Sequence, residues 1–185
     1  MAKKALVFLA EGFEEVEAVT VVDYLRRAGV DVTTAAISLF MTVKGARGVK
    51  VDADTLLAGV DGEVGNWDAV IIPGGLKGAA NIASCEEACK MIKNMAAAGK
   101  PVCAICASPA SVLSPLGLLA GKKFTCYPGM EEKVTDGNWS DERVVVDGNI
   151  ITSRGAGTAG HFAVAIIEKL LGQEAGKKIA DAVLL

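Results

Sequence analysis

Apolar and polar positions follow two periods along this chain, and its first third shows both. The continuous apolar run at 5–9 ("ALVFL") is typical of a buried strand. Apolar positions three and four apart predict a helix over about 14–28, which Gly29 ends. A second strand is predicted at 30–37 ("VDVTTAAI"), so the chain opens with a strand, a helix and a strand.

The same alternation continues to the end of the chain. The stretch 42–52 predicts a hairpin, and 67–75 ("WDAVIIPGG") predicts a central parallel strand that ends in a Gly-Gly turn. The later elements alternate helix and strand, at about 79–98, 101–105, after Cys106, 123–127 with 143–153, and 158–171. Since no repeat or linker interrupts the pattern, we expect residues 1–185 to form one doubly wound α/β domain. Its sheet should be mostly parallel, with helices on both faces.

Composition narrows the class of protein. With 51% hydrophobic and 22% charged residues, the chain suits a single soluble domain with a substantial core. The net charge is −3 and the basic residues are scattered, so neither a nucleic acid nor an acidic membrane is an expected partner. The uncharged run between Pro101 and Gly121 is long enough to span a bilayer, but internal Ser, Pro and Gly residues predict a buried segment instead.

The start of the chain and its cysteines predict the cellular compartment of the protein. The apolar run near the start is short and lacks a cleavage-like site, so we expect a cytoplasmic protein without a signal peptide. The five cysteines are an odd number at irregular spacing in a chain too large to need disulfides. Free thiols in a reducing compartment are therefore expected.

Candidate chemistry gathers after the predicted strands, because open α/β sheets bind ligands outside the carboxyl ends of their strands. Cys106 follows the strand at 101–105 among small residues, which is the pattern of a nucleophile elbow. The start of the next helix should favour its thiolate and lower the pKa of the thiol. The alternative is a buried, unreactive cysteine.

Other interpretations of the cysteines fit less well. A redox CxxC pair of Cys103 and Cys106 needs both sulfurs near the start of one helix, yet Cys103 lies in the middle of the predicted strand. Cys85 and Cys89 stand four apart on one helical face and resemble half of a zinc site, but no paired ligands complete it. We therefore expect no metal.

A catalytic cysteine also needs an acid or base. His161 is the only histidine, and its place near a helix start suits a half-exposed side chain without a catalytic role. Glu14 and Glu15 can be solvated or lie at the helix N-terminus. Glu17 shares a helical face with apolar residues, so burial should raise its pKa and let it donate to a thiolate. An exposed helical glutamate is the alternative.

Backbone amides can complete such a site. The Gly-Gly turn lacks a GxGxxG order and so does not predict a nucleotide. It favours an oxyanion pocket built from the amides of Gly75 and of Ala107, the residue after Cys106.

Four motifs, "FLAEGFEEVEAV", "VIIPGG", "AICASPA" and "ITSRGAGTA", occur in this order, and with them the chain resembles the ThiJ/PfpI superfamily in its DJ-one branch. The resemblance covers nearly the whole chain and implies a flavodoxin-like fold related to class I glutamine amidotransferases. It makes Cys106 the nucleophile and Glu17 the acid that contacts it. Further residues are implied as amide donors or as contacts near the site or the dimer interface: Gly74, Gly75 and Ala107, and Arg27, Arg47, Tyr127 and Arg154.

Two positions depart from family patterns. The protease-like branch has His immediately after the nucleophile, whereas Ala107 stands here, so peptidase activity is not expected. Some relatives have a histidine where Tyr127 precedes Pro128, and a mechanism that needs that histidine does not apply.

The resemblance implies a cofactor-independent, glutathione-independent glyoxalase that turns methylglyoxal into lactate, or a deglycase that removes glyoxal adducts, with a role in oxidative stress. The alternative is a noncatalytic redox sensor or chaperone in which Cys106 oxidises to a sulfinate. Apolar residues of the first helix (Val16, Val19 and Val22) and the hairpin exceed what one core requires. They predict a homodimer.

Overall fold

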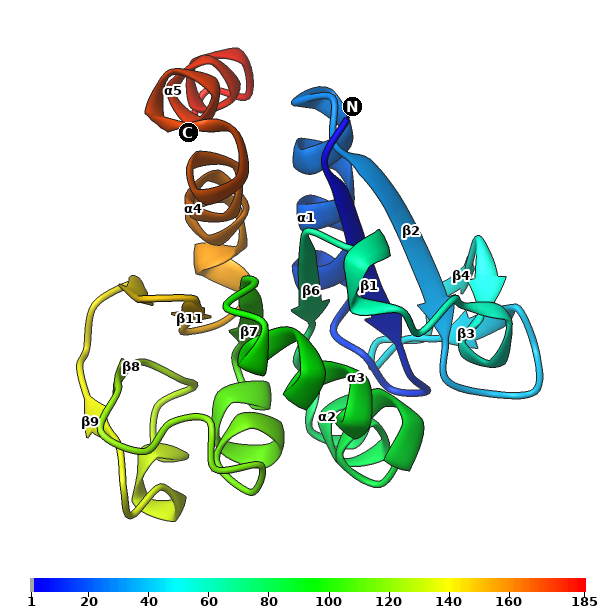
Figure 1. Cartoon of the computed structure of the whole chain (residues 1–185), viewed down its shortest axis with the longest axis horizontal. Helices are drawn as coiled ribbons and strands as arrows, with labels where there is room; N and C mark the ends of the chain where they lie inside the picture. The colour runs from blue at the N-terminus through cyan, green and yellow to red at the C-terminus, as the bar shows by residue number, and fades with distance from the viewer. Residues whose placement is uncertain (1) are drawn as a thin grey trace.

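The computed structural model describes residues 2–185, which build a seven-stranded sheet in the order β10-β11-β7-β6-β1-β2-β5 (Figure 1). The ladders from β5 through β11 are parallel, whereas β10 pairs antiparallel with β11. The strands in chain order are β1 (Lys4–Leu9), β2 (Asp31–Ala36), β5 (Thr55–Leu56), β6 (Ala69–Ile72), β7 (Val102–Ile105), β10 (Val144–Asp147) and β11 (Ile150–Ser153).

Helices cover both faces of this sheet, as the pattern predicted. On one face lie α1 (Glu15–Arg27) and α4 (Ala159–Leu171), with α5 (Gln173–Ala182) against α4 (Figure 1). On the other lie α2 (Leu76–Ala83) and α3 (Glu86–Ala97).

Strand periodicity places the core on both sides of the sheet. Successive side chains of a strand point to opposite faces, so in β1 Leu6 and Phe8 join the cluster under α2 and α3. Val7 and Leu9 join the cluster under α1 and α4. The doubly wound α/β fold is therefore confirmed.

Short strand pairs lie outside the seven-stranded sheet. The predicted hairpin is β3 (Thr42–Lys44) against β4 (Lys50–Asp52). Only Lys123–Phe124 of the stretch expected at 123–127 is a strand, β8, which pairs with β9 (Asn138–Trp139).

The prediction of one helix over 79–98 is wrong, because α2 and α3 are separate. Ser84 ends α2 and its hydroxyl donates to the carbonyl of Ala80 at 3.0 Å. Cys85 is extended, with φ −91° and ψ 106°, before α3 begins. A serine that bonds its own helix backbone competes with continuation of the helix.

Two further differences concern the segment after Cys106 and the end of the chain. The expected helix after Cys106 is a single π-helical turn, Pro109–Leu113. Helix α5 follows Gly172, at a φ of 93°, and was not predicted. Within residues 2–185, none of the helices combines the length and the apolar content needed to cross a bilayer.

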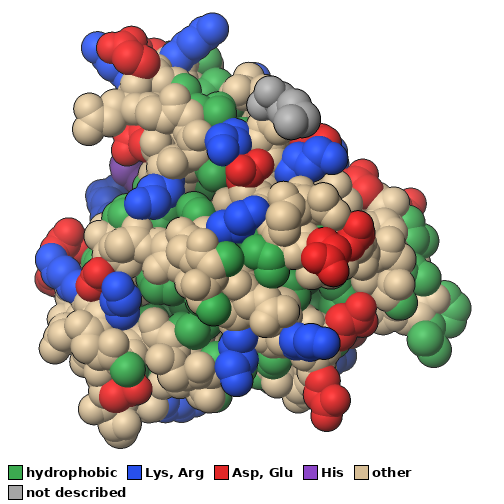
Figure 2. Space-filling model, in the orientation of Figure 1, with side chains coloured by type: hydrophobic (Ala, Val, Ile, Leu, Met, Phe, Trp, Pro, Cys, Tyr) green, Lys and Arg blue, Asp and Glu red, His purple; other side chains and the backbone are tan. Residues whose placement is uncertain are grey.

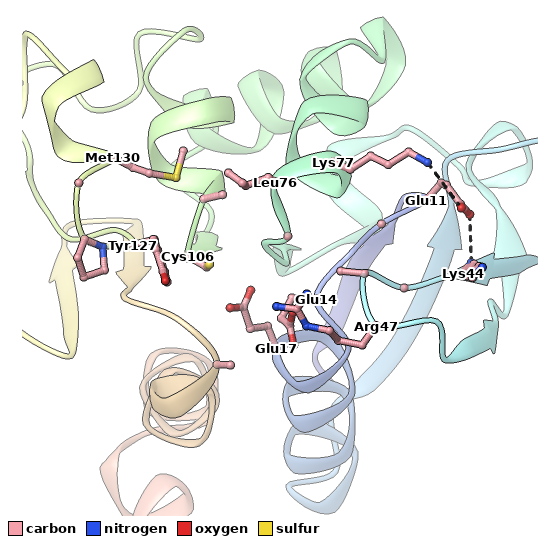
Figure 3. A pocket seen from close by; sticks show the side chains of 18 of the residues that line it. Glu11, Glu14, Glu17, Lys44, Arg47, Leu76, Lys77, Cys106, Tyr127 and Met130 are labelled. Carbon is pink, nitrogen blue, oxygen red and sulfur yellow. Dashed lines mark hydrogen bonds and ion pairs between the residues drawn. The ribbon is translucent and has the colours of Figure 1, made fainter.

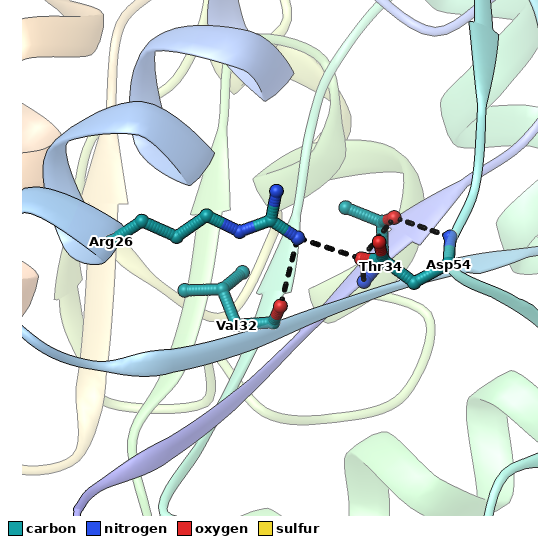
Figure 4. A network of polar contacts seen from close by, with 4 residues as sticks. All are labelled: Arg26, Val32, Thr34 and Asp54. Atoms are coloured by element: carbon teal, nitrogen blue, oxygen red, sulfur yellow. Dashed lines mark hydrogen bonds and ion pairs between the residues drawn. The ribbon is translucent and has the colours of Figure 1, made fainter.

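A polar network holds the far end of α1 to the sheet (Figure 4). Arg26 donates to the carbonyl of Val32 at 3.0 Å and to the Asp54 carboxylate at 2.8 Å. The same Asp54 oxygen accepts the amide and the hydroxyl of Thr34, each at 2.8 Å. This network orients α1, whose first turn carries the candidate acid Glu17. Elsewhere, charges of both signs are interspersed on the face seen in Figure 2.

Candidate active site

Cys106 occupies a sharp turn directly after β7. Its φ is 65°, a left-handed conformation that non-glycine residues rarely adopt and that costs about 1–3 kcal/mol. The amide of Cys106 donates to the carbonyl of Ser153 at 2.9 Å, and its own carbonyl accepts the amide of Tyr127 at 2.8 Å. Ser108 is fully buried and donates to the carbonyl of Pro73 at 2.6 Å. This is the geometry of a nucleophile elbow.

Glu17 meets the cysteine from the first turn of α1. Its side chain is only 1% exposed, so the alternative of a solvated helical glutamate is wrong. One carboxyl oxygen, Oε2, accepts the amide of Gly74 at 2.8 Å. The other, Oε1, is buried and has no hydrogen-bond partner that the geometry of residues 2–185 provides. Figure 3 shows the carboxyl of Glu17 pointing toward the sulfur of Cys106.

Burial controls the titration of this pair. It raises the pKa of Glu17 to about 7, although the nearby thiol and the Gly74 amide act in the opposite direction. Burial, and then the negative charge of Glu17, raise the pKa of Cys106 to about 12, against the amides of Gly75 and Ala107. The expected lowering of the thiol pKa is therefore wrong, because a helix start offsets neither burial nor a neighbouring carboxylate. Because the two groups titrate together, the Glu17–Cys106 pair holds one proton at a pH between about 7 and about 12.

The amides of the two glycines after β6 face different groups of the site. The amide of Gly75 points at the sulfur together with that of Ala107, whereas the amide of Gly74 binds Glu17. A Cβ on Gly74 would lie 2.5 Å from Glu17 Oε2 and 2.6 Å from the Cβ of Cys106. Side chains larger than hydrogen are thus excluded at Gly74 by the pair itself.

A pocket of about 840 Å³ opens above the pair. Its walls come from the loop before α1, the β3–β4 turn, the start of α2 and the segment after β8. Among the expected residues, Gly75, Ala107, Arg47 and Tyr127 line it with Glu17 and Cys106.

The other two arginines lie outside the lining of this pocket. Arg27 binds Asp23 at 2.7 Å near the end of α1. Arg154 donates to the carbonyl of Asp141 at 2.8 Å. The structure therefore brings Arg47 and Tyr127 to the pocket and leaves Arg27 and Arg154 for other contacts.

The remaining thiols and the histidine have different surroundings. Cys103 is fully buried, and burial raises its pKa, so the two cysteines of the CxxC motif do not share an accessible turn. Cys85 and Cys89 are partly exposed and free at the start of α3. His161 is half-buried in α4 and lines a separate pocket of about 460 Å³ with Arg143 and Leu185.

The sequence predicted a solvated or helix-terminal Glu15, which is buried, and it did not single out Leu76 or Met130. Glu15 is 8% exposed, and its Oε1 accepts the amides of Arg47 at 2.7 Å and Val49 at 3.3 Å. It thereby holds the β3–β4 turn against α1. Leu76 and Met130 also line the pocket. The position of Leu76 directly after the Gly-Gly turn could have indicated that it lies at the site. Nothing in the local sequence pattern places Met130 at the pocket.

Comparisons with known proteins agree with this geometry. The family model described as the DJ-1/PfpI family matches residues 3–169. Protein DJ-1 homolog B of Arabidopsis thaliana is 47% identical over 180 residues, which cover 97% of this chain and 41% of that protein. The chain spans less than half the length of this relative and of homolog A, at 41% and 45%.

Two further similarities extend over more than nine-tenths of both chains. Glutathione-independent glyoxalase DJR-1.2 of Caenorhabditis elegans is 37% identical over 175 residues, 93% of this chain and 91% of that protein. The structure of oxidized Toxoplasma gondii DJ-1 has a TM-score of 0.95 at 41% identity and covers 99% of this chain and 98% of that one. With the elbow, the buried glutamate and a family model that spans most of its length, this chain belongs to the DJ-1/PfpI family.

Proposed function

We propose that this protein is a cysteine-dependent, cofactor-independent glyoxalase that acts on methylglyoxal, or a deglycase that acts on glyoxal adducts. The observation that carries the proposal is the buried carboxyl of Glu17 beside the thiol of Cys106, in a pocket open to small molecules. A glyoxalase is named among the relatives, which supports the same chemistry. A cytoplasmic role in oxidative stress belongs to this proposal.

The chemistry begins when the sulfur of Cys106 adds to the aldehyde carbon of methylglyoxal, while the S–H bond breaks and its proton passes to the carboxylate of Glu17. The new C–S bond gives a hemithioacetal, whose oxyanion the amides of Gly75 and Ala107 can stabilise before it is protonated. A base then removes the proton on the former aldehyde carbon, and the electrons move to the neighbouring carbonyl oxygen to form an enediolate, which takes a proton on that oxygen to become the enediol. Glu17, whose pKa lies at about 7, is suited to take and return this proton.

The remaining steps close the cycle without an external oxidant. Protonation at the former ketone carbon, with loss of the hydroxyl proton on the sulfur-bearing carbon, yields a thioester of lactate. Water then attacks the thioester, the C–S bond breaks and the thiol recovers its proton. One carbon is oxidised while its neighbour is reduced, so the net reaction is methylglyoxal plus water to lactate.

The positions of the three arginines and of Tyr127 indicate which groups each of them contacts in this proposal. Arg47 and Tyr127 line the pocket and are candidates for contact with the substrate. Arg27 and Arg154 lie outside the lining and are candidates for contacts at the protein surface.

Replacing Glu17 tests the proposal. Glu17→Gln keeps a hydrogen-bonding side chain but cannot ionise, so it separates proton transfer from packing. We expect methylglyoxal turnover to fall on the order of 100-fold or more, while mass spectrometry still detects the thiol adduct. Exposed Glu174→Gln on α5 is the matched control and should turn over methylglyoxal like the wild type. Near wild-type turnover in Glu17→Gln would exclude Glu17 as the proton carrier.

The second candidate is a noncatalytic redox sensor or chaperone. A DJ-1 structure of Toxoplasma gondii is described as oxidized, and Cys106 here is a partly exposed thiol that two amides face. Under this candidate the wild-type protein does not turn over methylglyoxal, and mild peroxide converts Cys106 to the sulfinate before any other cysteine. Turnover by the wild type, measured beside peptide mapping after peroxide, decides between the two.

A further inference from the structure

The pocket above Cys106 is large for the substrate that the reaction alone requires. Its volume of about 840 Å³ lies within the range of roughly 300–1,000 Å³ that holds drug-sized ligands. Methylglyoxal has a single methyl group beside its two carbonyl groups and leaves most of this space unfilled. The space therefore has room for a much larger substituent on the same reactive group.

Apolar side chains from two facing segments line part of the pocket. Leu76 is 72% exposed although it follows Gly75 directly, whose amide faces the sulfur. Met130 and Tyr127 lie on the segment opposite, and Figure 3 shows Met130 and Leu76 extending toward each other beside Cys106. Binding of a ligand that covers an exposed leucine is favourable, because apolar surface is removed from water.

Charged residues also line the pocket, and one ion pair joins two of them. Glu11 lies 3.8 Å from the ammonium of Lys77 and accepts the backbone amide of Lys44 at 3.3 Å, as Figure 3 shows. Lys77 follows Leu76 on α2, whereas Glu11 lies in the loop before α1 and Lys44 at the end of β3.

We infer that Leu76, with Met130 and Tyr127, forms a wall that binds the apolar substituent of the substrate. The substrate class is a 2-oxoaldehyde with an aryl or branched alkyl substituent, which the site prefers over methylglyoxal. The reaction in this inference rests on the proposed function, whereas the wall itself does not. Leu76 is then a specificity-determining residue that contacts the part of the substrate that does not react.

The first test compares phenylglyoxal with methylglyoxal as substrates. The ratio of their kcat/KM values should fall about 10-fold in Leu76→Ser, which is typical for the loss of an apolar contact in a binding pocket. Leu76→Met should keep the wild-type ratio. Because Leu76 is exposed, neither change disturbs the core. Val146→Ser, at a position that is 51% exposed on β10, is the matched control. A ratio that Leu76→Ser leaves unchanged would overturn the inference.

The second test needs only the thiol. N-phenylmaleimide and N-methylmaleimide carry the same reactive group, and mass spectrometry of the Cys106 peptide gives the rate for each. The phenyl-to-methyl rate ratio should fall several-fold in Leu76→Ser and stay constant in Val146→Ser. If the wild type turns over neither oxoaldehyde, the proposed function fails. The ratio of the two maleimide rates then decides by itself whether Leu76 forms an apolar wall. An equal ratio in wild type and Leu76→Ser would refute the wall.

Discussion

The backbone at Cys106 and the side chain of Glu17 depend on each other at the scale of single residues. A positive φ aims the sulfur away from the sheet, toward a carboxyl that is 1% exposed. A buried carboxylate is unfavourable, so Glu17 keeps its proton to a pH well above its ordinary value. Strain and burial are both tolerated here because the surrounding β7 and β6 are fully buried.

The raised pKa of Glu17 predicts how stability depends on pH. Between its ordinary value of 4.5 and about 7, the folded state binds a proton that the unfolded state has released. The contribution of Glu17 to the free energy of unfolding is therefore fully present below pH 4.5 and is lost as the pH rises to 7. The loss is on the order of 3 kcal/mol. Urea unfolding of the wild type and of Glu17→Gln at several pH values measures it.

Glu17→Gln should lack this part of the decline and should gain stability relative to the wild type as the pH rises. Exposed Glu174→Gln serves as the control and should follow the wild-type curve. Parallel curves for the wild type and Glu17→Gln from pH 4.5 to 8 would contradict a raised pKa.

At the scale of elements, the junction between β6 and α2 positions the amides of the site. Gly75 has a φ of 83°, and the carbonyl of Gly12 would lie 2.3 Å from a Cβ built on it. The loop before α1 therefore packs directly against this turn, and α2 begins directly after Gly75, whose amide faces the sulfur.

Gly75→Ala should be far more destabilising than a glycine replacement of equal backbone strain. Gly99 has a φ of 71° and open space around it, so Gly99→Ala should cost only the strain, about 1–2 kcal/mol. Gly75→Ala adds a backbone overlap, and we expect it to lose at least about 2 kcal/mol more. Thermal unfolding of both variants measures the difference. Equal losses would show that the Gly12 loop gives way freely.

At the scale of the whole molecule, α1 and the β3–β4 turn present one apolar surface. Val16 and Val19 are each 50% exposed on α1, and Val49 is 54% exposed on the turn. Glu15 joins the two elements by accepting the amide of Val49. The sequence predicted a homodimer from Val16, Val19 and Val22 together with the hairpin, which contains Val49. Val22 is only partly exposed, and the dimer stays a prediction.

We expect light scattering at micromolar concentration to give twice the mass of one chain. Val19→Glu should reduce it to one, because two carboxylates would be buried at a self-paired surface. Val146→Glu, at an equally exposed valine on β10, should leave the mass unchanged. A wild-type protein that is monomeric under these conditions would remove the idea.

Much of this architecture follows from local pattern. The apolar runs at 5–9 and 67–75 are β1 and β6, and the small residues around Cys106 indicated its turn. Predictions failed where a hydrogen bond overrode the hydrophobic pattern. At Ser84 that bond is local, to the carbonyl of Ala80. Glu15 is buried by a contact with a distant residue, the amide of Arg47. Neither bond leaves a periodic signal.

The sequence by itself determined the fold class, the inward face of Glu17 and the turn at Cys106, because hydrophobic periodicity and residue size act over a few neighbouring positions. Only the tertiary structure decided the titration of the pair and the shape of the pocket. The pKa of Cys106 depends on burial and on Glu17, 89 residues away in the chain. Likewise Leu76 and Met130 line one pocket because the β6–α2 turn and the segment after β8 converge there. Electrostatic and packing energies depend on distance in space, which the order of residues does not contain.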